Sequence, residues 1–212
     1  MKPLLILFAI AFTLTAHSQR SGEGYHDVPT DFITGDFNGD GKQDTFSQFV
    51  ADSFGKTVSH LPRFGNWEDA VMFYAQSGYR NTYTFNNERI SMPSQDPEGT
   101  IGLMWLFNVG NINNTPGDEI ALVPQSDHGL DLNTCYIYSL CSGQWAQVYR
   151  FNISENAFTY PYGETEFAPY RNIPGFLEYT NGQWVHVDYM DIWDKPDDFI
   201  PTLHPLIVDN CK

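Results

Sequence analysis

The chain has 212 residues, of which 26 are acidic and 11 are basic, and its formal net charge is −15 at pH 7. This negative field disfavours binding to nucleic acid or to an anionic membrane, and it makes cations the natural partners. Aromatic residues make up 16% of the chain, which excludes disorder because such a chain can bury enough apolar surface to offset the cost of ordering.

The first 18 residues have the layout of a secretory signal peptide. Lys2 supplies a positive charge, Leu4 to Leu14 form an apolar run, and Ala16-His17-Ser18 places small residues where a signal peptidase cuts. This run is too short to span a membrane, which takes about 20 residues. We therefore expect cleavage near Ser18–Gln19, a secreted or periplasmic (cell-envelope) protein, and a single β domain over residues 19–212.

Residues 36–44 read Asp-Phe-Asn-Gly-Asp-Gly-Lys-Gln-Asp and predict a calcium-binding loop. Calcium takes six to eight oxygen ligands at about 2.3–2.6 Å. Three carboxylates repel one another unless a cation is bound, so we expect the loop to be linked to calcium. An acidic turn without an ion is the alternative. The expected ligands are the side chains of Asp36, Asn38, Asp40 and Asp44 and the backbone carbonyl of Lys42.

The flanks of this loop distinguish it from an EF-hand. An EF-hand loop has a glutamate at position 12 and lies between two helices. Position 12 here is Ser47, and the flanks Phe32-Ile33 and Thr45-Phe46 are typical of strands. We therefore expect the loop to join two strands.

Residues 32–46 also resemble the calcium-loop repeat of FG-GAP and VCBS-type proteins, whose blades build the propeller of integrin α-subunits. The run Gly-Asp-Phe-Asn-Gly-Asp-Gly-Lys-Gln-Asp at 35–44 matches the family pattern Gly-Asp-x-Asn-Gly-Asp-Gly-x-x-Asp. The resemblance implies a loop between two strands of one blade, with calcium held by the five residues named above.

A degenerate copy of the loop lies at residues 107–121, at an offset of 75 residues. Only one of its aligned ligand positions keeps a carboxylate, so we expect the turn geometry to persist and the calcium mostly to be lost. The strand after it, Ile120 to Val123, is expected to be buried. The aligned pairs are Asp36 with Asn111, Asn38 with Asn113, Asp40 with Thr115, Gly41 with Pro116, and Asp44 with Glu119.

Between these loops, residues 66–76 predict a short helix capped by Asn66, with a strand as the alternative. Elsewhere, runs of β-branched and aromatic residues predict antiparallel hairpins that turn at Asn86-Asn87, Ser142-Gly143 and Asn181-Gly182. The predicted fold class is therefore all-β, with antiparallel hairpins in a compact propeller-like or sandwich-like domain and few helices.

The three cysteines allow one disulfide. If residues 135–141 form one continuous strand, Cys135 and Cys141 are about 20 Å apart, whereas a disulfide needs Cα atoms within about 7 Å. We therefore expect Cys135 or Cys141 to pair with Cys211.

No catalytic set stands out. Ser126-Asp127-His128 are contiguous, whereas a triad is assembled in space. Glu164 and Glu166 would need to face each other across a cleft to act as glycosidase carboxylates. The leading hypothesis is an exported, calcium-binding, non-enzymatic β protein that binds a macromolecule or a glycan. The alternatives are a secreted, glycosidase-like hydrolase and a purely structural envelope protein.

Overall fold

The computed structural model describes residues 21–27, 31–64, 67–92, 100–126, 132–154, 177–191, 194–195 and 200–208. In these ranges antiparallel strands dominate, and helix is limited to α1 (Trp67–Ser77) and the single 3-10 turn η3 (Tyr189–Asp191). The predicted all-β class is therefore confirmed. The expected signal peptide lies outside the described residues. No helix within them is long and apolar enough to cross a membrane.

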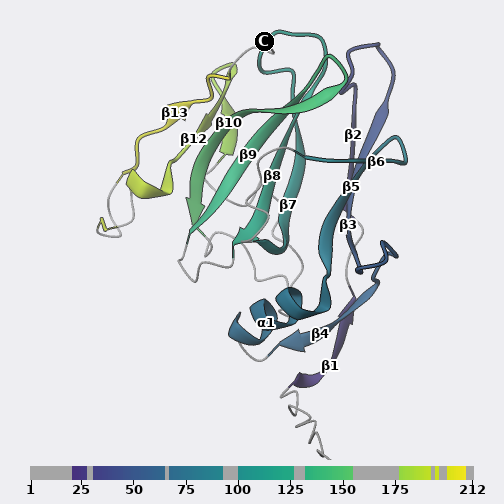
Figure 1. Ribbon diagram of the computed structural model, residues 1–212. Coiled ribbons are helices and arrows are strands. Elements are labelled where there is room, and N and C mark those ends of the chain that lie inside the picture. The colour runs from purple at the N-terminus through teal and green to yellow at the C-terminus, as the bar shows by residue number, and fades with distance from the viewer. Residues whose placement is uncertain are drawn as a thin grey trace, which may run out of the picture.

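The first large sheet is an antiparallel meander that contains the acidic loop (Figure 1). Its second and third strands are separated in the chain by an excursion that carries α1 and the short strand β4 (His60–Phe64), which pairs with β1 (Ser21–Asp27). This excursion accounts for part of the 75-residue offset between the two loops. The strands in order across the sheet are β2 (Asp31–Gly35), β3 (Asp44–Ala51), β5 (Arg80–Phe85) and β6 (Glu88–Ile90).

The second large sheet repeats this order, and its strand β7 lies beside β2 of the first sheet (Figure 1). A four-stranded meander is also the architecture of one propeller blade, and a propeller-like or sandwich-like arrangement of the domain stays a prediction. The strands in order are β7 (Thr100–Gly110), β8 (Glu119–Ser126), β9 (Leu132–Cys141) and β10 (Gln144–Ser154).

A third, smaller sheet follows at the far edge, beside β10 (Figure 1). It consists of β11 (Leu177–Thr180), β12 (Gln183–His186) and the two-residue strand β13 (His204–Pro205). Trp184 from β12 lies against Phe107 from β7, with ring centroids 6.1 Å apart. This contact links the small sheet to the core of the second large sheet.

All three predicted hairpin turns are confirmed. Both central residues of each turn have positive φ: 51° and 68° at Asn86-Asn87, 51° and 81° at Ser142-Gly143, and 51° and 82° at Asn181-Gly182. A two-residue turn of this kind matches the twist of the flanking strands and favours Asn and Gly. The turns therefore set the register of β5–β6, β9–β10 and β11–β12 from local sequence.

An aromatic cluster joins the two large sheets. Phe37, in the acidic loop, is 1% exposed, and its ring lies 6.1 Å from that of Trp145 on β10. Trp145 also contacts Phe46 and Phe85 of the first sheet, with ring centroids 5.1 and 5.8 Å away. Burial of such rings stabilises each by about 1.5–3 kcal/mol, so Phe37 anchors the acidic loop to the core.

The segment from Trp67 to Ser77 is helix α1 and not a strand. It packs through the buried ring of Tyr74 in a small cluster that includes Leu61 of β4. Its own core is separate from the aromatic cluster between the large sheets.

The two described cysteines lie as the predicted strand requires. Cys135 and Cys141 lie on one continuous strand, β9. Cys141 is disulfide-bonded, whereas Cys135 is a buried free thiol. The local pair is therefore excluded, as predicted, and Cys211, the remaining cysteine of the sequence, lies outside the described residues.

Candidate functional site

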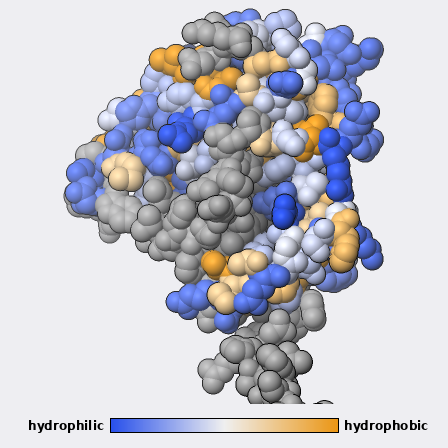
Figure 2. All heavy atoms as spheres, viewed as in Figure 1, coloured by the Kyte–Doolittle hydropathy of each residue, from blue (hydrophilic) through white to orange (hydrophobic). Residues whose placement is uncertain are grey.

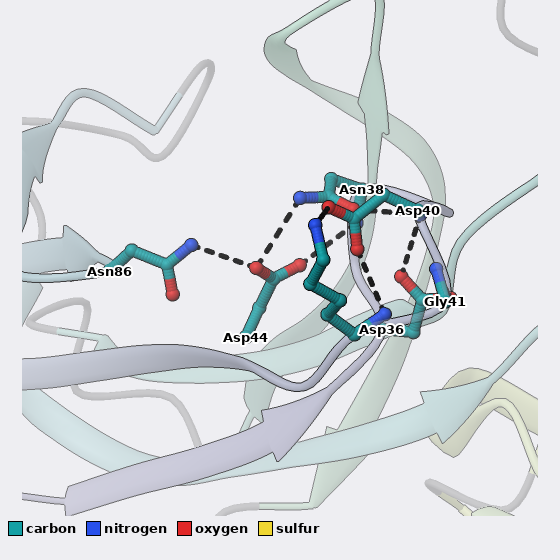
Figure 3. A network of polar contacts seen from close by, with 7 residues as sticks. Asp36, Asn38, Asp40, Gly41, Asp44 and Asn86 are labelled. Carbon is teal, nitrogen blue, oxygen red and sulfur yellow. Dashed lines mark hydrogen bonds and ion pairs between the residues drawn. The ribbon is translucent and has the colours of Figure 1, made fainter.

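The acidic loop joins β2 to β3, as its strand-like flanks predicted. Figure 3 shows the side chains of Asp36, Asn38, Asp40 and Asp44 gathered around this one turn. The register of the two strands pairs Gly35 with Asp44, so the eight residues between them must curl back on themselves. The structure thus brings all four predicted ligand side chains into one neighbourhood.

Asp36 and Asn38 point toward the same backbone group. The N–H of Asp40 lies 3.0 Å from Asp36 Oδ1 and 2.9 Å from Asn38 Oδ1, so it donates to both. The second oxygen of Asp36 accepts the N–H of Gly41 at 2.9 Å. The bond between Asn38 and Asp40 is that of an Asx-turn, and the bonds of Asp36 fold the loop over both side chains.

Asp44 closes the other side of the loop and is only 4% exposed. Its carboxylate accepts the backbone N–H of Asn38 at 3.1 Å and the side-chain amide of Asn38 at 3.3 Å. It also accepts the amide of Asn86 at 2.8 Å, from the β5–β6 turn (Figure 3). Asn86 was predicted only as a turn residue; no sequence signal linked it to Asp44, because the two are 42 positions apart.

Asp40 and Lys42 form the exposed rim. Asp40 Oδ1 accepts the N–H of Lys42 at 2.8 Å, and the ammonium of Lys42 lies 3.2 Å from Oδ2. The backbone N–H of Lys42, followed by its ammonium, lowers the pKa of Asp40. Lys42 was predicted to contribute only its carbonyl, so its charged side chain is an addition to the site: it partly offsets the negative charge.

The donor set suits a hard cation, although its present arrangement is that of a hydrogen-bonded turn. Three carboxylates and one amide oxygen are the ligand types that calcium prefers. Among the residues that the structure describes, no three His, Cys, Asp or Glu side chains converge in the geometry of a metal site. Asp36 and Asp40 accept N–H groups of the loop itself, so binding would require these oxygens to turn from the N–H groups to the ion.

The degenerate loop, between β7 and β8, repeats one feature of the first loop. Asn113 Oδ1 accepts the N–H of Thr115 at 2.7 Å, just as Asn38 accepts the N–H of Asp40. The two bonds occupy positions that the 75-residue alignment pairs. The strand that follows is buried, as predicted, with Ile120 to Val123 all at 0% exposure.

Glu119 fills the degenerate loop from within. Its side chain is fully buried and accepts the N–H of Ile112 at 2.7 Å and the hydroxyl of Ser139 at 3.0 Å. Burial raises the pKa of Glu119, and these hydrogen bonds oppose that effect. Neutral donors of the protein therefore satisfy this carboxylate, which is one methylene longer than Asp44.

The two loops bind each other directly. The N–H of Asp118 donates to the carbonyl of Asp36 at 2.8 Å, and the N–H of Asp36 donates to Asp118 Oδ2 at 3.2 Å. The amide of Asn108 bridges Asp118 Oδ2 and the carbonyl of Thr34, at 2.9 and 3.1 Å. Asp118 and Asn108 were missed from the sequence: Asp118 aligns with Gln43, which is not a ligand position.

Glycine makes this close approach possible. A Cβ on Gly39 would lie 2.5 Å from Pro116 Cβ, and one on Gly117 would lie 2.5 Å from the carbonyl oxygen of Phe37. Gly41 has nothing within 4 Å, so it serves only the positive φ of the turn. Gly39 thus has two roles. It permits the curl of the loop, which the sequence predicted, and it leaves room for Pro116, which the sequence did not predict.

Asp127, His128, Glu164 and Glu166 lie outside the described residues.

Comparison of the chain with protein-family models, with curated proteins and with solved structures gave no match. The resemblance of residues 32–46 to the FG-GAP and VCBS repeat stays a prediction.

Proposed function

We propose that this protein is an exported, non-enzymatic β module whose acidic loop binds calcium. The observation that carries this proposal is the gathering of Asp36, Asn38, Asp40 and Asp44 around the one turn between β2 and β3 (Figure 3). Four side chains with oxygen donors within nine residues provide ligands of the type that a hard cation such as calcium prefers. The family resemblance of residues 32–46 points the same way.

The role of the ion follows from what the loop contacts. Asp44 is bonded to the β5–β6 turn through Asn86, and Asp36 is bonded to the second sheet through Asp118. A cation among these carboxylates would relieve their mutual repulsion and hold both connections in place. Calcium is thus proposed to stabilise the junction between the two large sheets and to take part in no reaction.

The partner is proposed to be a macromolecule or a glycan. Phe32, Phe54 and Tyr179 are 62%, 95% and 63% exposed, and aromatic rings can stack on sugars. On the face drawn in Figure 2, apolar residues form separate patches among hydrophilic ones. This pattern favours a polar partner bound through individual rings over a partner that needs a broad apolar face.

Isothermal titration calorimetry of the metal-free protein with calcium tests the loop. We expect one calcium per chain in wild type, and at least a tenfold weaker affinity in Asp40→Asn. The matched control is Asp52→Asn, because Asp52 also accepts two turn N–H groups, from Phe54 and Lys56, but lies in a different loop. Absence of calcium binding in wild type, or equal weakening in both variants, would contradict the proposal.

A further inference from the structure

A second polar cluster lies between the small sheet and β10 and is separate from the acidic loop. His186, on β12, is 2% exposed. Its ring lies 4.1 Å from the ring of Phe151, with an interplanar angle of 30°. Tyr149 OH lies 3.1 Å from His186 Nε2, and His186 Nδ1 is buried. The ring is therefore enclosed mainly by groups that suit a neutral imidazole.

A second histidine faces the first. The ring of His204, on β13, lies 5.6 Å from that of His186, with an interplanar angle of 32°. His204 Nε2 lies 2.6 Å from Asp191 Oδ2 of η3, at the surface. The ionisable groups near His186 in the described structure are thus Tyr149 from β10, His204 from β13, and Asp188 and Asp191 from the segment after β12.

These groups set the protonation of His186. Burial and the charge of His204 lower its pKa to about 4, whereas a hydrogen bond with the backbone of Val187 and the charges of Asp188 and Asp191 raise it without overcoming them. The side-chain amide of Asn152, on β10, donates a hydrogen bond to Asp188 Oδ1 at 3.1 Å. At neutral pH the ring is therefore uncharged in the folded protein.

Residues 200–208, here called the C-terminal arm, are attached beside this ring. The arm pairs with β12 at only two positions, Pro205 with Val185 and His204 with His186. A third backbone bond joins the N–H of Leu206 to the carbonyl of Trp184 at 2.8 Å. The side chain of Leu206 is 9% exposed and belongs to the core of the second sheet.

We propose that the C-terminal arm is an acid-sensitive strap, held on β12 by neutral His186 and lifted off β12 when His186 becomes protonated. A positive charge on this buried ring would lose its hydration, and it would be repelled by the charge of His204, whose ring lies 5.6 Å away. Detachment of the arm admits water to His186 and separates the two rings. The pairing of β13 is short, but opening also exposes the buried side chain of Leu206, so the arm stays closed while His186 is uncharged.

The direction of the pH effect follows from linkage. The folded pKa of His186, about 4, lies below its ordinary value of 6.5. The open form, in which His186 is solvated, takes up a proton more readily than the closed form. Opening therefore becomes easier as the pH falls below 6.5 and levels off below 4, with a rise in the open fraction on the order of a hundredfold.

Release of the C-terminal arm would expose one edge of the small sheet. β13 covers one edge of β12, and β11 pairs with the other. An uncovered edge carries N–H and C=O groups that can pair with an added strand.

Hydrogen exchange of the full chain, measured by mass spectrometry from pH 7 to pH 4.5 at constant calcium, tests the strap. After correction for intrinsic exchange rates, protection in the arm and in β12 should fall by at least tenfold, while that of β8 should not. In His186→Phe, which keeps a ring on Phe151 without the titration, the fall should be largely lost. His60→Gln, on the distant strand β4, is the matched control and should behave as wild type.

A second variant and a second measurement keep the test decisive. If His186→Phe already lacks protection at pH 7, His186→Gln takes its place. Nuclear magnetic resonance of wild type reports the titration of His186 directly. Equal loss of protection in wild type and the His186 variant overturns the proposal. So does a wild-type arm that stays protected at pH 4.5, or a His186 that titrates near 6.5 in the folded protein.

Discussion

Asp36 and Asp118 bind each other in both directions, although they are 82 positions apart in the chain. The N–H of Asp118 donates to the carbonyl of Asp36, and the N–H of Asp36 donates to the carboxylate of Asp118. Each residue belongs to one of the two aligned loops. This pair therefore couples the acidic loop to the degenerate loop, and through them the two large sheets.

Removal of the Asp118 side chain should loosen this coupling. Asp118→Ala deletes the acceptor for the N–H of Asp36 and the amide of Asn108, and we expect a loss of about 1–3 kcal/mol in the free energy of unfolding. Urea denaturation followed by tryptophan fluorescence measures it. Asp194→Ala, whose exposed side chain pairs with its neighbour Lys195, is the control and should change stability by about 0.5 kcal/mol or less. Equal effects of the two variants would contradict the coupling.

The two glycines of the acidic loop should respond differently to alanine. Both have positive φ, 72° at Gly39 and 81° at Gly41, so both variants bear the cost of about 1–2 kcal/mol that a Cβ adds in this conformation. Only Gly39→Ala also forces a Cβ against Pro116, which should cost about 1–3 kcal/mol more. Chemical denaturation of both variants gives the difference. Gly41 is the internal control, and indistinguishable midpoints would show that the loops do not pack as described.

Calcium should raise the melting temperature of wild type. At a hundredfold excess of ion over the dissociation constant, binding stabilises the folded state by about 2.7 kcal/mol. Asp40→Ala should lose most of this gain, because it removes a carboxylate from the loop. Thermal melts with calcium, with magnesium and with chelator measure it, and magnesium should substitute poorly because it prefers a smaller octahedral shell.

The matched variant in the degenerate loop is Asn113→Ala. It removes the acceptor for the N–H of Thr115 and should lower stability without changing the calcium response. A wild-type melting temperature that chelator leaves unmoved would reduce residues 36–44 to an acidic turn.

Glu119 should give the degenerate loop a pH dependence of its own. Burial raises its pKa in the folded protein above the ordinary value of 4.5, so the folded state takes up this proton at a higher pH than the unfolded state. The resulting stabilisation is fully present below 4.5 and is lost as the pH rises through the folded value. Glu119→Gln cannot titrate. The free energy of unfolding of wild type relative to this variant should therefore increase as the pH falls from 7 to 4.5. A constant difference across this range would contradict the raised pKa.

Much of the local structure was determined by short stretches of sequence. Asn and Gly at the three hairpin turns favour positive φ, and each turn pairs strands that adjoin it in the chain. The alternation of oxygen side chains in residues 36–44 likewise produces the Asx-turn of Asn38 and the local bonds of Asp36 without help from distant residues. The separation of Cys135 and Cys141 followed from one continuous strand. The segment at 66–76 was left between helix and strand, and the choice between Cys135 and Cys141 as the partner of Cys211 was left open.

The contacts that make the site and the strap were decided by tertiary structure. Asn86 reaches Asp44 only because β3 pairs with β5 across an excursion that carries α1. Asp118 reaches Asp36 only because β7 lies beside β2, and His186 is enclosed only where the small sheet meets β10. Turn propensities and loop spacing act over a few residues, whereas these contacts depend on how separate sheets pack, and no local pattern in the chain encodes that packing.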